Sequence, residues 1–474
     1  MNASIKRRYR PLNEDTYQEY QALCELASKG IWRQRYHIQP PAGLLNDPNG
    51  FVFHQDYYYL CYQWFPLGAE HGLKYWRMLK SDNLATWQDQ GIFLSPDHLY
   101  DSHGAYSGSA LSMGDSILIA YTGNHRDENW VRTPYQITVK RFADGELSEK
   151  KPFWNEAPQG YTEHVRDPKI WQENDGSLGM VLGAQRENLT GSALYLESHD
   201  GEHWKLKGDI DFGLPHFGYM WECPDYFALN GTDVFTFCPQ GLPADGEKQK
   251  NLYQCGYVVG HFDKALCRFE HSGFRELDYG FEFYASQSAL DSEGRRVMVG
   301  WLGLPDITVV SKDEGWAHCL SLPRVLSLKN GELLQTPHPD LQRLRYSRPH
   351  NGIHFELLLD NPENEPFVFY LRQKDEIRTR IEFDGKALYF DRSQSGALPA
   401  NEKEVEGKGG HIRVYETKAL WHLQIFADTS SLELFINDGQ ATMSGRIFPP
   451  ADANQLSLQH GAGATLTIFS LHED

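Results

Sequence analysis

The sequence predicts an all-β chain in which a five-bladed β-propeller is followed by a C-terminal β-sandwich, with a short N-terminal helix. From Tyr36 to about residue 340 the chain consists of short alternating runs, such as "YYYLCYQWF" and "SILIAYTGN", separated by Asn, Asp, Gly and Pro. Within this region, polar residues in similar settings recur about 60 residues apart. Beyond residue 346 the alternation continues without those recurring residues. A chain of 474 residues also exceeds the size of a single core, which favours two domains.

Residues 1–35 are predicted to be a helical extension. The stretch "EDTYQEYQALCELASK", residues 14–29, places apolar side chains at the spacing of an amphipathic helix. The basic cluster "KRRYR", Lys6 to Arg10, precedes it, and the polar residues that follow lack the apolar core of a signal peptide. The sequence therefore predicts one helix before the main fold, no export signal and a cytoplasmic location.

Residues 36–340 are predicted to form the propeller. The recurring polar residues are Asp47, Ser107, Asp167, Glu222 and Tyr284. Since a propeller blade is built from four short strands, a repeat of this length fits five blades whose innermost strands each present one residue to the central axis. The segments "SDNLATW" and "SHDGEHW" also resemble each other, which indicates the same hairpin in two blades.

Residues 346–474 are predicted to form a separate β-sandwich. Runs such as "LWHLQIFADTSSLELFIND" alternate between apolar and polar residues and are separated by Asp-Gly and Asn-Asp-Gly turns. A length of roughly 125 residues is typical of this architecture. The region contains no obvious catalytic motif.

The composition excludes several classes of partner. A net charge of -19 repels nucleic acids and anionic membranes, and no apolar run is long enough to cross a bilayer. The 7 cysteines are scattered without a Cys-x-x-Cys pair, which favours reduced core thiols over disulfides or zinc ligands. Aromatic residues make up 13% of the chain, as suits strands and also sugar-binding sites.

Three motifs place a carboxylate among apolar residues near a proline: "NDPNG" with Asp47, "HVRDPKIW" with Asp167 and "GYMWECPDYF" with Glu222. Burial raises the pKa of a carboxyl group, so three such groups point to one functional site. Glycoside cleavage needs one carboxylate that attacks the anomeric carbon or positions water, and a second carboxyl group that protonates the leaving oxygen. The apolar neighbours of Glu222 favour the acid role, whereas Asn46 and turn amides would keep Asp47 ionised.

The segment around Asp47 also has a purely structural interpretation. Asp-Pro starts turns and Asn-Gly closes tight hairpins, so "NDPNG" is a turn signal. The two interpretations are compatible, because a stiff, bent segment at the start of an inner strand would hold a nucleophile in place.

The ordered motifs "NDPNG", "YQW", "YSGSA", "RDPK", "WECPD", "FEFYASQ" and "SSLELFINDG" resemble the invertase-type glycoside hydrolases of family 32, in particular the bacterial sucrose-6-phosphate hydrolases. The resemblance covers nearly the whole chain and implies a five-bladed propeller followed by a β-sandwich. It implies a retaining β-fructofuranosidase in which Asp47 is the nucleophile and Glu222 the general acid and base. Asp167 would bind fructose hydroxyls and stabilise the transition state.

The same resemblance implies the residues that line the fructose pocket. On one side it places Asn46, Gln63, Tyr106 and Ser107, and on the far side Glu282, Tyr284 and Trp301. Arg166, beside Asp167, would help to hold the fructose hydroxyls. His71 stands where many sucrose-cleaving relatives carry Trp, so we expect it near the glucose end of the substrate, where Lys74 or Arg126 could add positive charge for a 6-phosphate. His71 could equally be a surface residue without a ligand.

Three alternatives remain open at this stage. Sucrose and sucrose 6-phosphate both fit the motifs, as does a fructan hydrolase or fructosyltransferase that uses the same three carboxylates. A carbohydrate-binding propeller without catalysis would need neither nucleophile nor acid. We expect no cofactor and no metal, a sugar or sugar phosphate as partner, and neither nucleic acid nor membrane. The sequence is compatible with a homodimer that forms through the sandwich domain.

Overall fold

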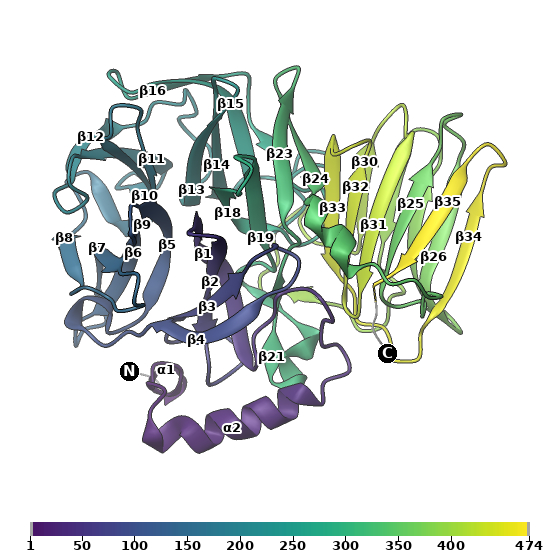
Figure 1. The fold of residues 1–474 in the computed structure, drawn as a ribbon, viewed down its shortest axis with the longest axis horizontal. Helices are drawn as coiled ribbons and strands as arrows, with labels where there is room; N and C mark the ends of the chain where they lie inside the picture. Colours follow the sequence, from purple (N-terminus) through teal and green to yellow (C-terminus); the bar gives the residue numbers. More distant parts are fainter. Residues whose placement is uncertain (1–2, 472–474) are drawn as a thin grey trace.

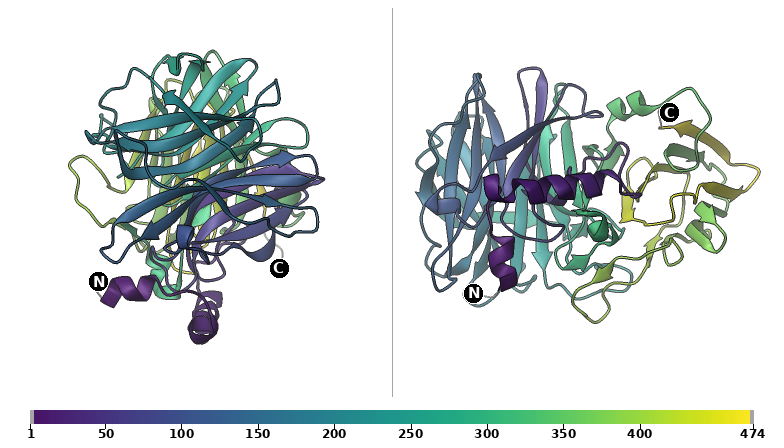
Figure 2. Two further views of the ribbon diagram at one scale, coloured as in Figure 1. Left: turned by 90° about the vertical axis from the view of Figure 1, so that its left-hand side faces the viewer. Right: turned by 90° about the horizontal axis from the view of Figure 1, so that it is seen from below.

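The computed structural model describes residues 3–471 and consists almost entirely of strands. Figure 1 shows a propeller and a sandwich side by side, with the N-terminal helix α2 along one edge of the propeller. Figure 2 shows the same two bodies from the end and from below. The predicted fold class is confirmed.

The first three blades are formed by consecutive hairpins. Blade 1 contains β1 (Gly43–His54), β2 (Tyr57–Phe65), β3 (Tyr75–Ser81) and β4 (Gln88–Leu94). Blade 2 contains β5 (Ala105–Met113), β6 (Ser116–Arg126), β7 (Arg132–Arg141) and β8 (Lys151–Trp154). Blade 3 contains β9 (Tyr161–Gln172), β10 (Leu178–Arg186), β11 (Gly191–Ser198) and β12 (Lys205–Asp209).

The last two blades include short additional strands. Blade 4 contains β13 (Met220–Leu229), β14 (Thr232–Gln240), β15 (Gly256–Asp263), β16 (Arg268–His271) and β17 (Arg275–Glu276). Blade 5 contains β18 (Tyr284–Leu290), β19 (Arg296–Leu302), β22 (Cys319–Leu320), β23 (Arg324–Lys329) and β24 (Glu332–Pro337). The short 3-10 helices are η1 (Leu99–Asp101), η2 (Val310–Glu314) and η3 (Pro339–Leu344).

The five innermost strands form a closed ring. Strands β1, β5, β9, β13 and β18 contact one another in this order, and β18 contacts β1 again. The strand β21 (Trp316–Ala317), which lies between β19 and β22 in the sequence, pairs in parallel with Gly43 and Leu44 of β1. This parallel pairing joins the last blade to the first.

The sandwich consists of two sheets of five strands. One contains β33 (Ala441–Arg446), β32 (Ser431–Ile436), β31 (His422–Asp428), β25 (Phe355–Asp360) and β35 (Thr465–Ser470). The other contains β30 (Ile412–Glu416), β28 (Ala387–Asp391), β27 (Ile377–Phe383), β26 (Phe367–Lys374) and β34 (Gln455–His460). A small sheet of β20 (Ile307–Thr308) and β29 (Ala400–Asn401) joins the two domains. We propose that the domain boundary lies near η3, as the sequence suggests.

Every innermost strand carries an irregularity at the same level. The pairing register shifts after Leu45 in β1, after Ala105 in β5 and after Glu222 in β13. Corresponding shifts occur around Asp167 in β9 and after Tyr284 in β18. A β-bulge leaves residues unpaired and turns their side chains, so five bulges around one axis direct five side chains into the same space.

The bulge in β1 corrects the turn interpretation of "NDPNG". This segment does not close a hairpin, because Gly43–His54 is one continuous strand with two register shifts. The hairpin lies further on, at Gln55 and Asp56, which have positive φ angles of 45° and 54°.

The N-terminal extension contains two helices, α1 (Ala3–Arg8) and α2 (Glu14–Ser28). The sequence predicts α2, whereas α1 is too short for a periodic pattern to reveal. Asn13 caps α2 by accepting hydrogen bonds from the backbone N–H groups of Asp15 and Thr16. The segment before α2 is fixed to blade 1, because the Leu73 N–H donates to the Arg8 carbonyl oxygen at 2.8 Å.

Candidate active site

The bulges of the five inner strands bring together the residues that the sequence singles out. Asp47, Ser107, Asp167, Glu222 and Tyr284 lie on β1, β5, β9, β13 and β18. Hydrogen bonds connect them in two groups, one around Asp47 and one around Glu222.

Asp47 is held by side chains from three strands. Its Oδ2 atom accepts hydrogen bonds from Ser107 Oγ at 2.5 Å and from Gln63 Nε2 at 3.2 Å, and its Oδ1 atom accepts one from Asn46 Nδ2 at 3.0 Å. Gln63 also donates to Ser107. Burial raises the pKa of Asp47 above its ordinary value, while the Ser107 hydrogen bond opposes this rise. Side chains therefore position Asp47, rather than the expected turn amides.

Glu222 lies in a polar environment, which corrects the expectation of apolar neighbours. Arg166 donates to Oε1 through Nη2 at 2.7 Å and Nε at 3.1 Å. Oε2 accepts hydrogen bonds from Tyr284 OH at 2.6 Å and from Gln240 Nε2 at 2.7 Å. The sequence neighbour Trp221 instead packs against Phe237, with 4.4 Å between ring centroids. Side chains alternate along a strand, so flanking residues do not define the surroundings of Glu222.

Asp167 lies between the two groups. Its Oδ2 atom accepts a hydrogen bond from the Cys223 N–H at 2.9 Å, and the Cys223 thiol lies 3.6 Å from oxygens of both Asp167 and Asp47. Burial raises the pKa of Asp167 to about 7, with Arg166 opposing the rise and the charges of Glu222 and Asp47 adding to it. Its φ of 64° places it in the left-handed region, which is strained for Asp and common at functional sites. The three carboxyl groups therefore lie close together.

A line of hydrogen bonds extends from Glu222 to the edge of blade 2. His164 Nδ1 lies 2.9 Å from Arg166 Nη1 and 3.2 Å from Arg132 Nη1. Burial and these two cations lower the pKa of His164 to about 4, so its ring is neutral and Nδ1 accepts both hydrogen bonds. Tyr106 lies beside this line, with its ring 5.7 Å from the guanidinium carbon of Arg132.

Lys74 joins the site through Asn46. Its Nζ atom donates to Asn46 Oδ1 at 2.7 Å. Burial lowers the pKa of Lys74 to about 7, although the Asp47 charge opposes the change. Lys74 thus places a cationic or neutral amine next to the pair of Asn46 and Asp47.

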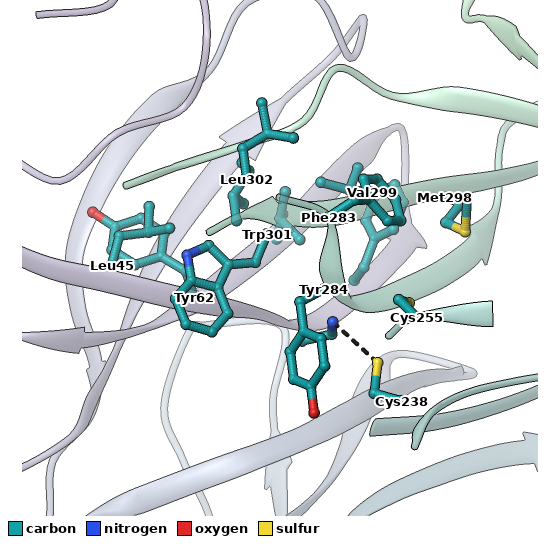
Figure 3. Close-up of a cluster of buried hydrophobic side chains, with 14 of the residues drawn as sticks. Leu45, Tyr62, Cys238, Cys255, Phe283, Tyr284, Met298, Val299, Trp301 and Leu302 are labelled. Carbon is teal, nitrogen blue, oxygen red and sulfur yellow. Dashed lines mark hydrogen bonds between the residues drawn. The ribbon is translucent and has the colours of Figure 1, made fainter. Parts of the chain in front are cut away.

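His71 and Trp301 lie on the side of Tyr284. The centroid of the Trp301 ring lies 6.2 Å from that of the Tyr284 ring and 6.0 Å from that of the His71 ring. In Figure 3 the hydroxyl of Tyr284 points away from Trp301, which is only 1% exposed. The His71 side chain is solvent-exposed, yet dense surrounding protein lowers its pKa well below the ordinary value.

Glu282 does not join this group, which corrects the sequence expectation. Its carboxylate accepts hydrogen bonds from Arg392 Nη1 at 2.6 Å and from the Arg446 N–H at 2.9 Å, and both partners belong to the sandwich. Glu282 lies before β18 begins, so strand alternation does not place it on the face of Tyr284. Glu282 connects the domains.

Three arginines gather around Tyr9, and within residues 3–471 none of them forms an ion pair with a carboxylate. Arg126 and Arg132 are directly paired at the ends of β6 and β7, and Arg8 comes from the N-terminal extension. Their hydrogen bonds go to the carbonyl oxygens of Trp130 and His71 and to the His164 ring. Within residues 3–471, the buried Nε atoms of all three have no hydrogen-bond partner. We call Arg8, Arg126 and Arg132 the arginine cluster.

Tyr9 packs into the middle of the arginine cluster. Its ring lies 5.7 Å from the His103 ring and 5.1 Å from the Trp130 ring. Burial raises the pKa of Tyr9 to about 12, and the nearby charges of the three arginines lower it again. The N-terminal extension therefore contributes to the wall of the pocket.

Sequence reasoning missed several residues of the site. Gln240, Cys223, His164, Arg132 and Arg8 all lie at it. For Cys223 and His164 a signal existed, because they adjoin the "WECPD" and "RDPK" motifs. Across residues 3–471, no three or more His, Cys, Asp or Glu side chains are grouped so that they could hold a metal ion.

Comparison with known families identifies the chain. The model of the "Glycosyl hydrolases family 32 N-terminal domain" matches residues 37–337, and that of the "Glycosyl hydrolases family 32 C terminal" matches residues 330–473. The chain belongs to glycosyl hydrolase family 32. The resemblance drawn from the motifs is confirmed, and with it the prediction that this family 32 protein is a glycoside hydrolase.

Relatives of this family 32 chain match over nearly their whole length. The sucrose-6-phosphate hydrolase of Staphylococcus xylosus is 41% identical, with 99% of this chain and 98% of the relative covered. That of Bacillus subtilis (strain 168) is 38% identical, with 92% and 93% covered. Among solved structures, sucrose-6-phosphate hydrolase from Lactobacillus gasseri has a TM-score of 0.92 at 31% identity, covering 99% of each chain. A Bombyx mori β-fructofuranosidase in complex with sucrose has a TM-score of 0.81 at 27% identity, with 97% and 98% covered.

Proposed function

We propose that this chain is a retaining β-fructofuranosidase that hydrolyses sucrose 6-phosphate in preference to sucrose. The arginine cluster, which His164 and Arg166 link to Glu222, is the observation that carries the preference. Like charges directly opposite each other across two strands destabilise the fold, and Arg126 and Arg132 occupy such positions. A phosphate group would accept hydrogen bonds from the unused N–H groups of these arginines and would neutralise their positive charge. The relatives named sucrose-6-phosphate hydrolase support the same conclusion.

The arrangement of donors supports a double displacement. Asp47 attacks the anomeric carbon of the fructosyl group while the bond to the bridging oxygen breaks and Glu222 gives its proton to that oxygen. Glucose 6-phosphate leaves, and a fructosyl ester on Asp47 remains. Glu222 then removes a proton from water, which attacks the same carbon and releases fructose and Asp47. Two inversions at one carbon give net retention.

The remaining residues bind and orient the sugar in this proposal. Asn46, Gln63 and Ser107 hold the Asp47 carboxylate in line, which is the function of a preorganised site. Asp167 binds fructose hydroxyls and balances the positive charge that develops in the transition state. Tyr284, Gln240 and Arg166 stabilise the ionised form of Glu222 that activates water. Tyr106, His71 and Trp301 complete the walls, and Glu282 is left out.

Substitution of the two central carboxylates tests the mechanism. We expect Asp47→Asn and Glu222→Gln each to lower kcat by at least about 1,000-fold, because each removes a group that acts in the transition state. Azide should partly rescue a Glu222→Ala variant and leave Asp47→Asn inactive, since only the former still forms the fructosyl ester. Full turnover by either Asp47→Asn or Glu222→Gln would contradict the mechanism. Circular dichroism confirms folding.

Comparison of two substrates tests the phosphate preference. We expect Arg132→Met and Arg8→Met each to lower kcat/KM for sucrose 6-phosphate by roughly 10- to 100-fold, because each variant loses a charge-assisted hydrogen bond to the phosphate. On sucrose, which has no phosphate, kcat/KM should fall by less than about threefold. The control is Arg268→Met on the outer strand β16, where the side chain is 58% exposed and both values should stay unchanged. Equal losses on both substrates would show that the cluster has only a structural function.

The His71→Ala variant, measured in the same way, tests the assignment of His71.

A further inference from the structure

A cavity of about 540 Å³ lies between the propeller and the sandwich, and none of the three carboxylates lines it. Its propeller wall includes Phe281 and Leu304, and its sandwich wall is formed by residues between Pro399 and Arg413. The sheet of β20 and β29 connects the two walls. This volume lies within the range of small-molecule sites. We call it the interdomain cavity.

Two buried arginines lie on the Phe281 ring in this cavity. The guanidinium carbons of Arg392 and Arg413 are 3.9 Å and 4.6 Å from the ring centroid, and both side chains are 4% exposed. Arg392 pairs with Glu282. Arg413 donates to the carbonyl oxygens of Gly280 and Gly409 and to the side chain of Asn251. The propeller thus supplies one carboxylate for two guanidinium groups at this ring.

Polar atoms in the cavity wall lack partners. Within residues 3–471, the buried Nε atom of Arg392 and the buried Nδ1 atom of His411 form no hydrogen bond. Both residues line the cavity. Buried donors and acceptors are normally satisfied, so unpaired ones around an open space indicate a ligand. A purely structural contact between domains would not need this space.

The positive charge in the wall is only partly neutralised. Lys408 donates to the Gln249 carbonyl oxygen, and burial lowers its pKa to about 8. Burial and the neighbouring Arg392 lower the pKa of Arg413 to about 10, although Glu282 and Glu276 oppose this. The Glu404 and Glu406 side chains line the exposed rim. An anion in the cavity would relieve the unfavourable burial of these cations.

We propose that the interdomain cavity is a second ligand site, which binds a small sugar phosphate independently of the catalytic pocket. The phosphate group would accept hydrogen bonds from Arg392, Lys408 and His411. The cavity is larger than a phosphate ion requires, and Leu252, Leu304 and Pro399 offer apolar surface to one face of a sugar ring. The ligand would contact both domains and stabilise their interface. The site does not depend on the reaction proposed for Asp47 and Glu222.

Titration calorimetry with glucose 6-phosphate and with inorganic phosphate tests this site on the full chain. The Arg132→Met variant weakens phosphate binding by the arginine cluster of the catalytic pocket, so it serves as the parent protein. We expect it to bind one glucose 6-phosphate, at least about tenfold more tightly than inorganic phosphate. Equal affinity for the two compounds would overturn the assignment of a sugar phosphate.

The double variant Lys408→Met with His411→Ala, made in this parent, should lose the remaining binding by at least about tenfold. Neither residue belongs to the catalytic pocket, so hydrolysis by the same double variant in the native background should be unchanged. The matched control is Lys418→Met, a lysine of the sandwich that does not line the cavity. Unchanged binding in the double variant would overturn the proposal.

Thermal unfolding with and without glucose 6-phosphate provides a second measurement. We expect the ligand to raise the unfolding temperature only where Lys408 and His411 are intact.

Discussion

Asp47 is controlled by two opposing effects, burial and donated hydrogen bonds. Burial raises its pKa above the ordinary value of 3.8, and the hydrogen bond from Ser107 is the largest effect that lowers it. A nucleophile must be ionised, so the proposed reaction is lost as the pH falls through the raised pKa of Asp47. The acidic limb of the pH profile should therefore lie above the range of an ordinary aspartate.

The Ser107→Ala variant should move this acidic limb to higher pH. Removal of the donor destabilises the ionised form of Asp47, so kcat/KM should fall more at pH 5 than at pH 7. The matched control is Ser112→Ala on the same strand, whose hydroxyl pairs with His54 instead. Its pH profile should match that of the native protein. An unshifted limb in Ser107→Ala would show that Ser107 does not set the pKa of Asp47.

At the scale of single residues, the sequence predicts what lies within motifs and misses what only the fold brings close. Asp47, Asp167 and Glu222 follow from their motifs, and the structure places them together. Arg8 and Gln240 lie in unremarkable segments and reach the site through chain packing. Glu282 shows the opposite error, since it belongs to a motif yet faces the sandwich.

The hairpins of the blades repeat their capping chemistry. Ser81, at the end of β3, accepts hydrogen bonds from the N–H groups of Asn83 and Leu84. Ser198, at the end of β11, accepts them from Asp200 and Gly201. The similarity of "SDNLATW" and "SHDGEHW" therefore corresponds to the same turn in blades 1 and 3.

The Ser81→Ala variant should lower the free energy of unfolding by about 1–3 kcal/mol, because it leaves two backbone N–H groups without their acceptor. Ser81 is 4% exposed, so water replaces the hydroxyl poorly. Urea denaturation measures the change. The exposed Ser393→Ala serves as control and should stay within about 0.5 kcal/mol of the native protein. A similar small change in Ser81→Ala would contradict the capping function.

At the scale of elements, the period of alternation predicts strands well and their irregularities poorly. The number of blades follows from repeated motifs, and α2 follows from its apolar spacing. The β-bulges could not be predicted from the sequence, because a strand that contains Asp-Pro and Asn-Gly has the same local signals as a turn. Pairing with β2, and with β21 at Gly43 and Leu44, keeps Gly43–His54 extended.

A buried network connects the two domains and the start of the propeller. His37 lies 2.8 Å from Asp428 and 3.0 Å from Glu433, both of the sandwich, and all three side chains are 0% exposed. Glu433 also pairs with Arg324 of blade 5 at 2.6 Å. Although burial alone would lower the pKa of His37, the hydrogen bonds to Asp428 and Glu433 raise it to about 10. Proton binding by His37 therefore stabilises the joined domains.

The stability contributed by His37 should depend on pH with a defined sign. A raised pKa gives a contribution that is complete below 6.5, the unfolded value, and is lost as the pH rises through about 10. We expect His37→Gln to cost about 3 kcal/mol at pH 6, because it removes the cation that pairs with Asp428 and one of the two that pair with Glu433, and clearly less at pH 10. Urea denaturation of both proteins at the two pH values measures the difference. A cost that is independent of pH would show that His37 is neutral in the folded protein.

The parallel pairing of β21 with β1 has a consequence for the order in which the protein is made. The strand with Asp47 leaves the ribosome early, yet the inner-strand residue Tyr284 follows half a chain later and the partner residue Trp316 later still. At roughly 5–20 residues per second, the nucleophile waits for on the order of tens of seconds before the ring can close. Nascent chains that end before blade 5 should therefore be inactive, and a translational pause in that interval would prolong the exposure of the edge of β1.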